Sequence, residues 1–153
     1  MGKTMKNSCK KILVELRKNA RESITNISKK TGIPTSTVFL KIKDCEENVV
    51  RKHTTLIDYA KLGFNHWQKT AIKLSDFQNR DFEKFLLAHP NVNSVYQINT
   101  GYDYLVETVH ENVKEYMNFK KEMESQFRIE EKQEFQIIND LKRENFMTTI
   151  EEP

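Results

Sequence analysis

The segment 23–38 constrains the fold of this chain more than any other stretch of its sequence. Ser23 is a favourable helix N-cap, and small or apolar residues recur on one helix face after it. These residues are Ile24, Ile27, Ser28 and Thr31. Gly32 can adopt the left-handed conformation that ends a helix, and Ile33-Pro34 then restarts the chain. The segment therefore predicts two short helices joined by a tight turn, a helix-turn-helix.

Helical periodicity continues on both sides of this segment. Ser8 can cap a preceding helix, and Asn48 is the expected end of a helix of about ten residues that follows Pro34. The apolar stripes of these helices consist of Ile12, Leu13 and Leu16 in the first and of Val38, Ile42 and Cys45 in the last. We expect residues 49–50 and 54–57 to be extended.

The second half of the chain alternates between the strand period and the helix period. We expect a strand at 66–74, a helix near 82–86, strands at 92–99 and 104–110, a helix near 113–127 and a strand at 134–137. Gly101 opens the turn of a hairpin between the two middle strands. The order β-α-β-β-α-β is that of a ferredoxin-like antiparallel sheet. The predicted fold class is therefore α+β.

The charge of the chain is divided unequally between these halves. Residues 1–64 contain 14 Lys or Arg and 6 Asp or Glu, a formal charge of +8, whereas residues 65–153 contain 11 and 16, a charge of −5. A basic half can meet a polyanion, although basic residues can also simply solvate a helical surface. We expect four parts: a helix-turn-helix domain at 1–52, an extended hinge at 53–64, a ferredoxin-like domain at 65–146 and a loose tail at 147–153.

The sequence lacks the patterns of a catalytic or metal-binding protein. Its four glycines are too scattered for a nucleotide-binding loop, and no histidine lies at metal-ligand spacing from Cys9, Cys45 or another histidine. We expect no enzyme activity, no cofactor and no metal. The longest apolar run, 85–88, is far shorter than the ~20 residues of a membrane span, so no membrane partner is expected. Two cysteines fit a reducing compartment, and we expect a cytoplasmic protein.

The helix after Pro34 carries the side chains that a DNA-binding helix needs. Hydroxyl groups can reach base edges or phosphates, apolar groups can touch a thymine methyl, and lysines can pair with phosphates. The candidate DNA contacts on this helix are Thr35, Ser36, Thr37, Phe39, Leu40, Lys41 and Lys43. Those around it are Lys29, Lys30, Arg51 and Lys52. Double-stranded DNA is the expected partner, and the alternative is a three-helix bundle that binds no nucleic acid.

Four short elements carry a family resemblance. They are Ile12-Leu13 through Asn19-Ala20-Arg21, the pattern Gly-Ile-x-x-Ser-Thr-Val at 32–38, Lys61-Leu62-Gly63, and Thr100-Gly101-Tyr102-Asp103-Tyr104. In combination they resemble the leucine-responsive regulatory family (Lrp/AsnC, the feast/famine transcription regulators). The resemblance covers about residues 8–146, in the family's order and spacing.

This resemblance implies a winged-helix DNA-binding domain joined by the hinge to a regulatory domain. Members form homodimers through the regulatory sheets and assemble further into larger homo-oligomers. An amino acid or related small molecule is implied as an effector that binds between dimers and modulates DNA binding. Carried over to this chain, Gly101 and Asp103 fall on the hairpin that lines the effector site. Asp103 could equally be an ordinary turn-capping residue.

Three positions depart from the family pattern. Leu40 stands where members often have arginine, and Pro34 replaces the usual serine cap, for which Thr35 could substitute. The loop 45–50 is shorter and lacks the family's glycine. These departures leave the predicted fold intact but put the familiar DNA contacts in doubt.

The leading interpretation is a sequence-specific DNA-binding transcription regulator of the Lrp/AsnC type, acting as a dimer or higher oligomer. Two alternatives share parts of the pattern. Decarboxylases of the sirohaem type resemble it in layout, although Asp103 stands where cations for propionates would be needed. An architectural protein that compacts DNA would use the same basic surface without reading much sequence.

Overall fold

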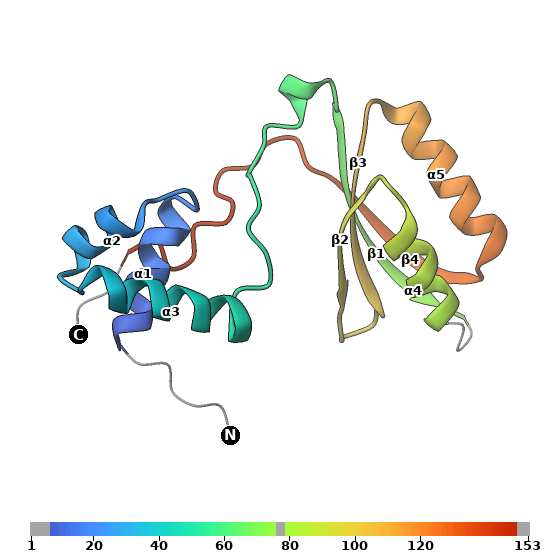
Figure 1. Cartoon of the computed structure of the whole chain (residues 1–153). Helices are drawn as coiled ribbons and strands as arrows, with labels where there is room; N and C mark the ends of the chain where they lie inside the picture. Colours follow the sequence, from blue (N-terminus) through green and yellow to red (C-terminus); the bar gives the residue numbers. More distant parts are fainter. Residues whose placement is uncertain (1–6, 76–78, 150–153) are drawn as a thin grey trace. The chain divides into compact units, whose positions relative to one another are not determined.

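The structure is a computed structural model that describes residues 7–75 and 79–149. The described residues form two compact units (Figure 1). The helical unit contains residues 7–56 and 142–149, and the sheet unit contains residues 57–75 and 79–141. Residues 142–149 thus cluster with the helices, whereas the sequence assigned 142–146 to the ferredoxin-like domain and 147–153 to a loose tail. Residues 1–6 and 150–153, at the ends of the predicted domain and tail, lie outside the described residues.

The helical unit contains α1 (Asn7–Lys18), α2 (Ile24–Thr31) and α3 (Thr35–Asn48). The predicted turn is confirmed, because Ser23 Oγ accepts the Asn26 backbone N–H at 3.1 Å and so caps α2. Gly32 ends the helix in the left-handed conformation, with φ of 70° and its N–H donating to the Ser28 carbonyl. The prediction that Ser8 caps α1 is wrong, because Ser8 lies inside that helix.

Helix α3 begins without a side-chain cap. Thr35 is already helical, and Pro34 occupies the N-cap position, so Thr35 does not substitute for the missing serine. The helix ends at Asn48 as predicted, but its 14 residues exceed the expected ten. Residues 50–58 have no regular secondary structure. The segments that were expected to be extended, 49–50 and 54–57, therefore form no strand.

Two small clusters hold the helical unit together. Ile12, Ile27 and Val38 are fully buried in one cluster, which joins all three helices. Cys9, Leu13 and Cys45 form the other, and Met147 of the C-terminal segment packs against it. Arg17 anchors that segment, because its guanidinium donates to the backbone carbonyls of Glu144 and Phe146 at 2.8 and 2.9 Å. These contacts explain why residues 142–149 are not a loose tail.

The sheet unit confirms the predicted order β-α-β-β-α-β. Its elements are β1 (His66–Leu74), α4 (Asn79–Ala88), β2 (Val92–Gln97), β3 (Tyr104–His110), α5 (Val113–Gln126) and β4 (Ile129–Gln136), preceded by a 3₁₀ turn at Ala60–Leu62. The strands form an antiparallel sheet in the order β2-β3-β1-β4. Strand β4 begins five residues earlier than predicted, because this edge strand carries mostly charged side chains and shows no apolar alternation over that part.

One face of the sheet is covered by α4 and α5 (Figure 1). The core under the helices is formed by Ile72, Leu74, Phe82, Leu86, Tyr104, Val106, Tyr116, Phe119 and Met123. Alternate residues of β1 and β3 point to this face, which places the residues between them on the other face. In the described part of the chain, no helix is both long enough and apolar enough to cross a membrane.

Candidate nucleic-acid interface

Helix α3 buries one side and exposes the other. Val38 and Cys45 are buried against α1 and α2, with Ile42 half-buried beside them. On the opposite side Phe39 is 44% exposed and Leu40 is 65% exposed. The predicted DNA contacts that share this exposed stripe are Thr35, Ser36, Phe39, Leu40 and Lys43. Apolar side chains held in water on one helix face are typical of a surface that contacts a partner.

Thr37 and Lys41, two other predicted DNA contacts on α3, lie outside this exposed stripe. Thr37 and Lys41 are half-buried, and the Lys41 ammonium lies 4.0 Å from the sulfur of Cys9 on α1. Lys43 instead stays on the outer face, with its ammonium 4.8 Å from the centre of the Phe39 ring, a cation–π contact. The structure therefore brings Lys43, and not Lys41, into the exposed stripe.

Acidic residues limit the stripe to the part of α3 that precedes Asp44. Asp44, Glu46 and Glu47 occupy the C-terminal half, where Asn48 donates to Asp44 and His53 contacts Glu46 at 3.1 Å. Carboxylates repel phosphate, so the end of the helix that can approach DNA is the one that begins at Thr35. Recognition helices of helix-turn-helix proteins contact base edges with the same end.

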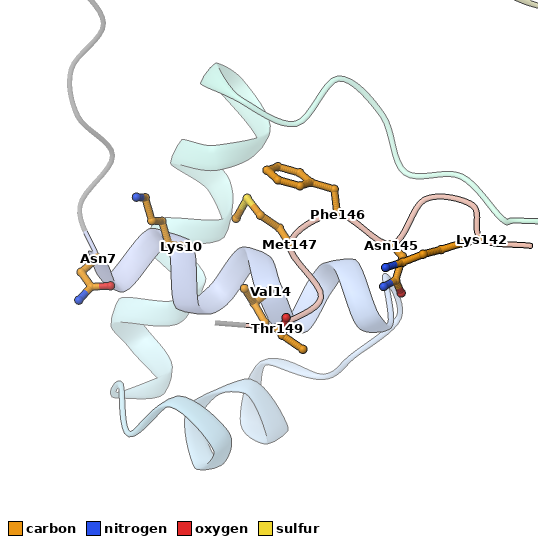
Figure 2. A pocket seen from close by; sticks show the side chains of 8 residues that line it. All are labelled: Asn7, Lys10, Val14, Lys142, Asn145, Phe146, Met147 and Thr149. Carbon is orange, nitrogen blue, oxygen red and sulfur yellow. The ribbon is translucent and has the colours of Figure 1, made fainter. Parts of the chain in front are cut away.

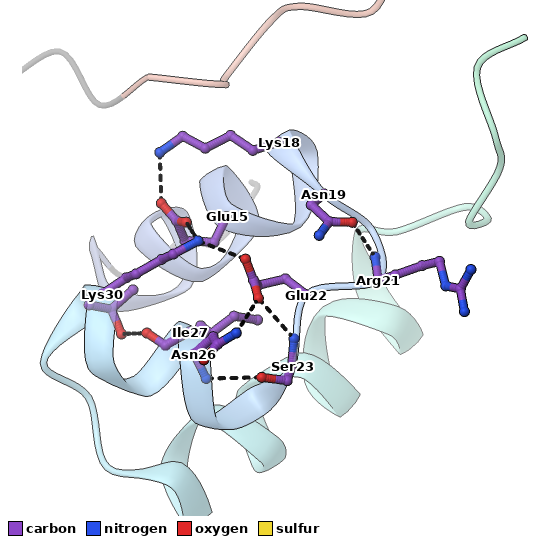
Figure 3. A network of polar contacts seen from close by, with 10 residues as sticks. Glu15, Lys18, Asn19, Arg21, Glu22, Ser23, Asn26, Ile27 and Lys30 are labelled. Carbon is purple, nitrogen blue, oxygen red and sulfur yellow. Dashed lines mark hydrogen bonds and ion pairs between the residues drawn. The ribbon is translucent and has the colours of Figure 1, made fainter.

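The acidic residues of α1 and of the loop before α2 are neutralised inside the unit (Figure 3). Lys18 donates to Glu15 at 2.7 Å, and Lys30 bridges Glu15 at 3.3 Å and Glu22 at 2.6 Å. The Lys18 hydrogen bond holds the pKa of the Glu15 carboxyl below its ordinary value, and Lys30 does the same for the pKa of Glu22. Asn26 also donates to Glu22, which ties the network to the first turn of α2.

This network changes what the predicted basic contacts can do. Lys30 pairs with two carboxylates, Glu22 and Glu15, which raise the pKa of its ammonium group. Its positive charge is therefore neutralised within the unit and is less able to pair with a DNA phosphate. By contrast, Lys29, Lys43, Arg51 and Lys52 are exposed and make no ion pair with any carboxylate of residues 7–75 and 79–149. Sequence spacing could not separate Lys29 from Lys30, because the carboxylates that hold Lys30 come from α1 and the loop before α2.

The hairpin between β2 and β3 contains both predicted effector residues. Gly101 has φ of 96°, and its neighbour Thr100 also has a positive φ of 71°, which is strained for a β-branched residue. One carboxylate oxygen of Asp103 accepts the Leu74 backbone N–H at 2.8 Å, so this side chain ties the hairpin to β1. Tyr102, which sequence reasoning did not single out, donates its hydroxyl to Glu131 at 2.7 Å. The Asp103 side chain therefore has a structural partner in β1 and not in its own turn.

Helix α1 and the C-terminal segment line an open groove of about 810 Å³ (Figure 2). Its lining residues are Asn7, Lys10 and Val14 of α1 and Lys142, Asn145, Phe146, Met147 and Thr149 of the segment. The groove combines two lysines with apolar side chains. Sequence reasoning missed it because nothing in residues 142–149 signals that they return to the helices. Within the ranges that the structure describes, no group of three His, Cys, Asp or Glu is arranged to hold a metal ion.

A three-helix unit with a cationic, partly apolar recognition face defines a DNA-binding protein of the helix-turn-helix class. A family model of winged helix-turn-helix DNA-binding domains matches residues 10–48, which run from α1 to the end of α3. Transcriptional regulator AzlB of Bacillus subtilis is 30% identical over 123 residues, which are 78% of this chain and 78% of the relative. The chain belongs to the Lrp/AsnC family of transcription regulators.

Solved structures share the fold of the chain. An AsnC family transcriptional regulator from Agrobacterium tumefaciens has a TM-score of 0.81 and 23% identity and covers 97% of each chain. A transcriptional regulator from Neisseria meningitidis in complex with L-Met has a TM-score of 0.82 and 17% identity, over 92% of this chain and 94% of that chain.

Family membership decides between the interpretations of the sequence. The chain is a DNA-binding transcription regulator, and the family to which it belongs consists of regulators and not of enzymes. The decarboxylase alternative is therefore wrong.

Proposed function

We propose that the chain reads duplex DNA with the N-terminal half of α3, acts as a dimer or higher oligomer, and changes its DNA affinity when an amino acid or related small molecule binds. The exposed stripe of α3 carries the first part of this proposal. Ser36 can reach base edges, Phe39 can touch a thymine methyl, and Lys43 can pair with phosphate. Lys29, Arg51 and Lys52 supply backbone contacts around it. Because the regulator must meet DNA, we also propose a cytoplasmic location.

The face of the sheet opposite α4 and α5 supports assembly into a dimer. Cross-strand pairs place aromatic and aliphatic side chains on this face, away from α4 and α5: Trp67 lies opposite Val109, Tyr96 opposite Leu105, and Phe135 opposite Lys69. Tyr96 and Phe135 are exposed. An apolar sheet face is stabilised by covering it, and a second copy of the same sheet would do so with two-fold symmetry. A two-fold dimer would also present two recognition helices to two DNA half-sites.

The hairpin supports an effector of the amino-acid class. Gly101 has no side chain to keep a ligand from the backbone, and Asp103 is an exposed carboxylate that can receive an amino group. A relative of the same fold, from Neisseria meningitidis, is known in complex with L-Met. L-Met is therefore the first effector to test on this chain.

The test is a selection of bound DNA fragments over a range of salt concentrations, repeated with and without L-Met and a pool of the other amino acids. We expect affinity to fall with salt, with a slope near −0.9 for each phosphate contacted, and a discrete footprint on the selected DNA. Binding that does not respond to salt would contradict the proposal. An even ladder of protection along any DNA would instead support the compaction alternative.

A matched pair of variants tests the recognition stripe. Phe39→Ala should change the preferred DNA sequence, because Phe39 lies in the exposed stripe. Leu87→Ala removes an exposed apolar side chain of α4, away from the proposed dimer face, and should leave sequence preference unchanged. Unchanged preference in Phe39→Ala would remove this residue from the reading surface.

A further inference from the structure

The helical unit buries the only two cysteines of the chain side by side. Cys9 lies in the first turn of α1 and Cys45 in the last turn of α3. They are 6% and 2% exposed, both thiols are free, and they belong to one cluster with Leu13. Cys9 is also close enough to Cys45 to affect the pKa of the Cys45 thiol. Two thiols that are 36 positions apart in sequence thus meet between the recognition helix and the helix that supports it.

The surroundings of the two sulfur atoms differ. The Lys41 ammonium lies 4.0 Å from the sulfur of Cys9, and it stands one helical turn before Cys45 on α3. Cys9 also lies at the positive end of α1. A positive charge therefore lies beside the Cys9 sulfur, which we assign as the attacking thiol. Burial, followed by the nearby Cys9, raises the pKa of the Cys45 thiol to about 11, which keeps that thiol protonated.

We propose that Cys9 and Cys45 form a modification site, where a small peroxide converts the thiol pair into a reversible disulfide that lowers DNA affinity. Cys9 attacks one oxygen of the peroxide, which forms a sulfenic acid and releases the other oxygen as water after protonation. The Cys45 sulfur then attacks the sulfenic sulfur, and its hydroxide leaves as a second water. Overall, two thiols and one hydrogen peroxide give one disulfide and two waters. A small thiol reverses the reaction by disulfide exchange.

The groove beside α1 gives a small oxidant a route to the pair. Met147 lines the groove (Figure 2). The same side chain also packs against the cysteine cluster. The neighbouring lining residues Asn7 and Lys10 flank Cys9 in the first turn of α1. Leu16, Val50 and Met147 pack against the cluster, and of these three Met147 also lines the groove. A small peroxide would therefore enter where this flexible side chain moves aside.

The disulfide would act on the recognition helix itself. Bond formation brings the two sulfur atoms to about 2 Å, closer than two thiols in contact. The cluster is closely packed, so the two sulfur atoms can come this close only if α3 shifts against α1. Helix α3 carries Ser36, Phe39 and Lys43, so its displacement changes their fit to DNA.

The experiment treats the folded full chain with hydrogen peroxide, blocks the remaining thiols under denaturing conditions, and measures intact mass and DNA affinity at fixed salt. We expect the mass to fall by two hydrogens, with neither cysteine blocked, and affinity to fall roughly fivefold or more. A thiol reductant should restore both. Mass reports the disulfide without DNA, so a negative result for the proposed effector does not affect this reading.

Three outcomes would overturn the proposal. In the first, both thiols remain free at peroxide concentrations that oxidise free cysteine. In the second, the disulfide forms between two chains and not within one chain. In the third, a disulfide forms within the chain but DNA affinity does not change. Variants identify the roles: Cys45→Ser should stop at a sulfenic acid on Cys9, and Cys9→Ser should resist peroxide. Lys41→Gln should slow oxidation several-fold. Equal reactivity of Cys9→Ser and the parent chain would overturn the assignment of Cys9 as the attacking thiol.

Discussion

The helical unit and the sheet unit bury polar groups in opposite ways. In the helical unit both buried clusters consist of aliphatic and sulfur side chains, and the nearly buried Glu15 is paired with two lysines. In the sheet unit the covered face is apolar at one end and polar at the other. The buried polar residues of that face are His66, Gln68, Thr70, Thr108 and His110. Neither the His110 ring nor the Thr108 hydroxyl has a hydrogen-bond partner among the residues that the structure describes.

This difference separates what each unit responds to. The helical unit keeps its unpaired cations on the surface, where phosphate and salt can act on them. The sheet unit keeps titratable rings inside, so a change of pH acts on its stability. We therefore expect substitutions in the helical unit to divide cleanly into stability effects and DNA effects, and the sheet unit to show the stronger dependence of stability on pH.

The largest expected effect comes from removing one residue of the small helical core. Ile27→Ala truncates a fully buried side chain of the cluster that joins the three helices, and it should lower the free energy of unfolding of the helical unit by about 3 kcal/mol. Hydrogen exchange measured on peptides from α1, α2 and α3 reports this loss.

The matched variant in the sheet unit is Ile72→Ala, which empties an equally buried position. Its effect should appear in the fluorescence of Trp67, the only tryptophan, which lies in β1. If each variant destabilised both units alike, the two units would unfold as one, which would contradict their independent stability.

The next largest effect is the loss of sheet-unit stability in acid. Burial, with the charges of His66 and His89 nearby, lowers the pKa of His110 from 6.5 to about 4. As pH falls through this window the unfolded chain takes up a proton that the folded unit does not, so stability is lost between pH 6.5 and 4. The cost at pH 4 is up to about 3 kcal/mol.

Denaturant unfolding followed by Trp67 fluorescence at several pH values measures this loss. His110→Phe keeps an aromatic ring among Tyr116 and Phe119 but removes the proton site, so it should flatten the pH dependence. His53→Asn, a change of an exposed histidine in the helical unit, should not. If His110→Phe kept the full dependence of the unfolding free energy on pH, His110 would not be the group that causes it.

The units also differ in how well their sequences predict them. Strands β1 and β3 have the predicted bounds, because alternating apolar residues mark a sheet with one covered face. Strand β4 was largely missed, because an edge strand can be built from charged residues whose backbone pairing is set by β1. The position of residues 142–149 was missed for a similar reason. It depends on hydrogen bonds from Arg17 of α1 and not on any hydrophobic periodicity of the segment itself.

The candidate site shows the same limit at the level of single side chains. The sequence predicted the exposed stripe of α3 correctly at Phe39 and Lys43, because helix periodicity determines which face is opposite Val38. It also predicted Lys41 as a phosphate contact beside the stripe, whereas this lysine is half-buried, with its ammonium 4.0 Å from the sulfur of Cys9. A long flexible side chain is directed by partners from other helices, and spacing along one helix cannot reveal them.

A smaller effect distinguishes two adjacent lysines. Lys30→Met removes the partner that Glu15 and Glu22 share, so it should lower the thermal stability of the helical unit, less than Ile27→Ala does. Lys29→Met should leave stability unchanged, because Lys29 makes no ion pair within the described ranges. For DNA affinity the order should reverse, with the larger loss in Lys29→Met. Equal behaviour of the two variants in both measurements would show that the network does not set their roles.

The smallest expected effect on stability comes from Lys43→Ala, since Lys43 is exposed and makes a cation–π contact with Phe39 but no ion pair among the described residues. Its effect on DNA should nonetheless be uniform: weaker binding to all sequences, and a salt dependence reduced by about one phosphate contact. Lys84→Ala is the matched control, because Lys84 is an exposed lysine of α4 that pairs with Asp81 at 3.2 Å. Fluorescence anisotropy over a salt series measures both slopes. If Lys84→Ala lowered the slope as much as Lys43→Ala, phosphate contact would not be confined to the helical unit, and the division of charge between the two units would no longer explain where this regulator meets DNA.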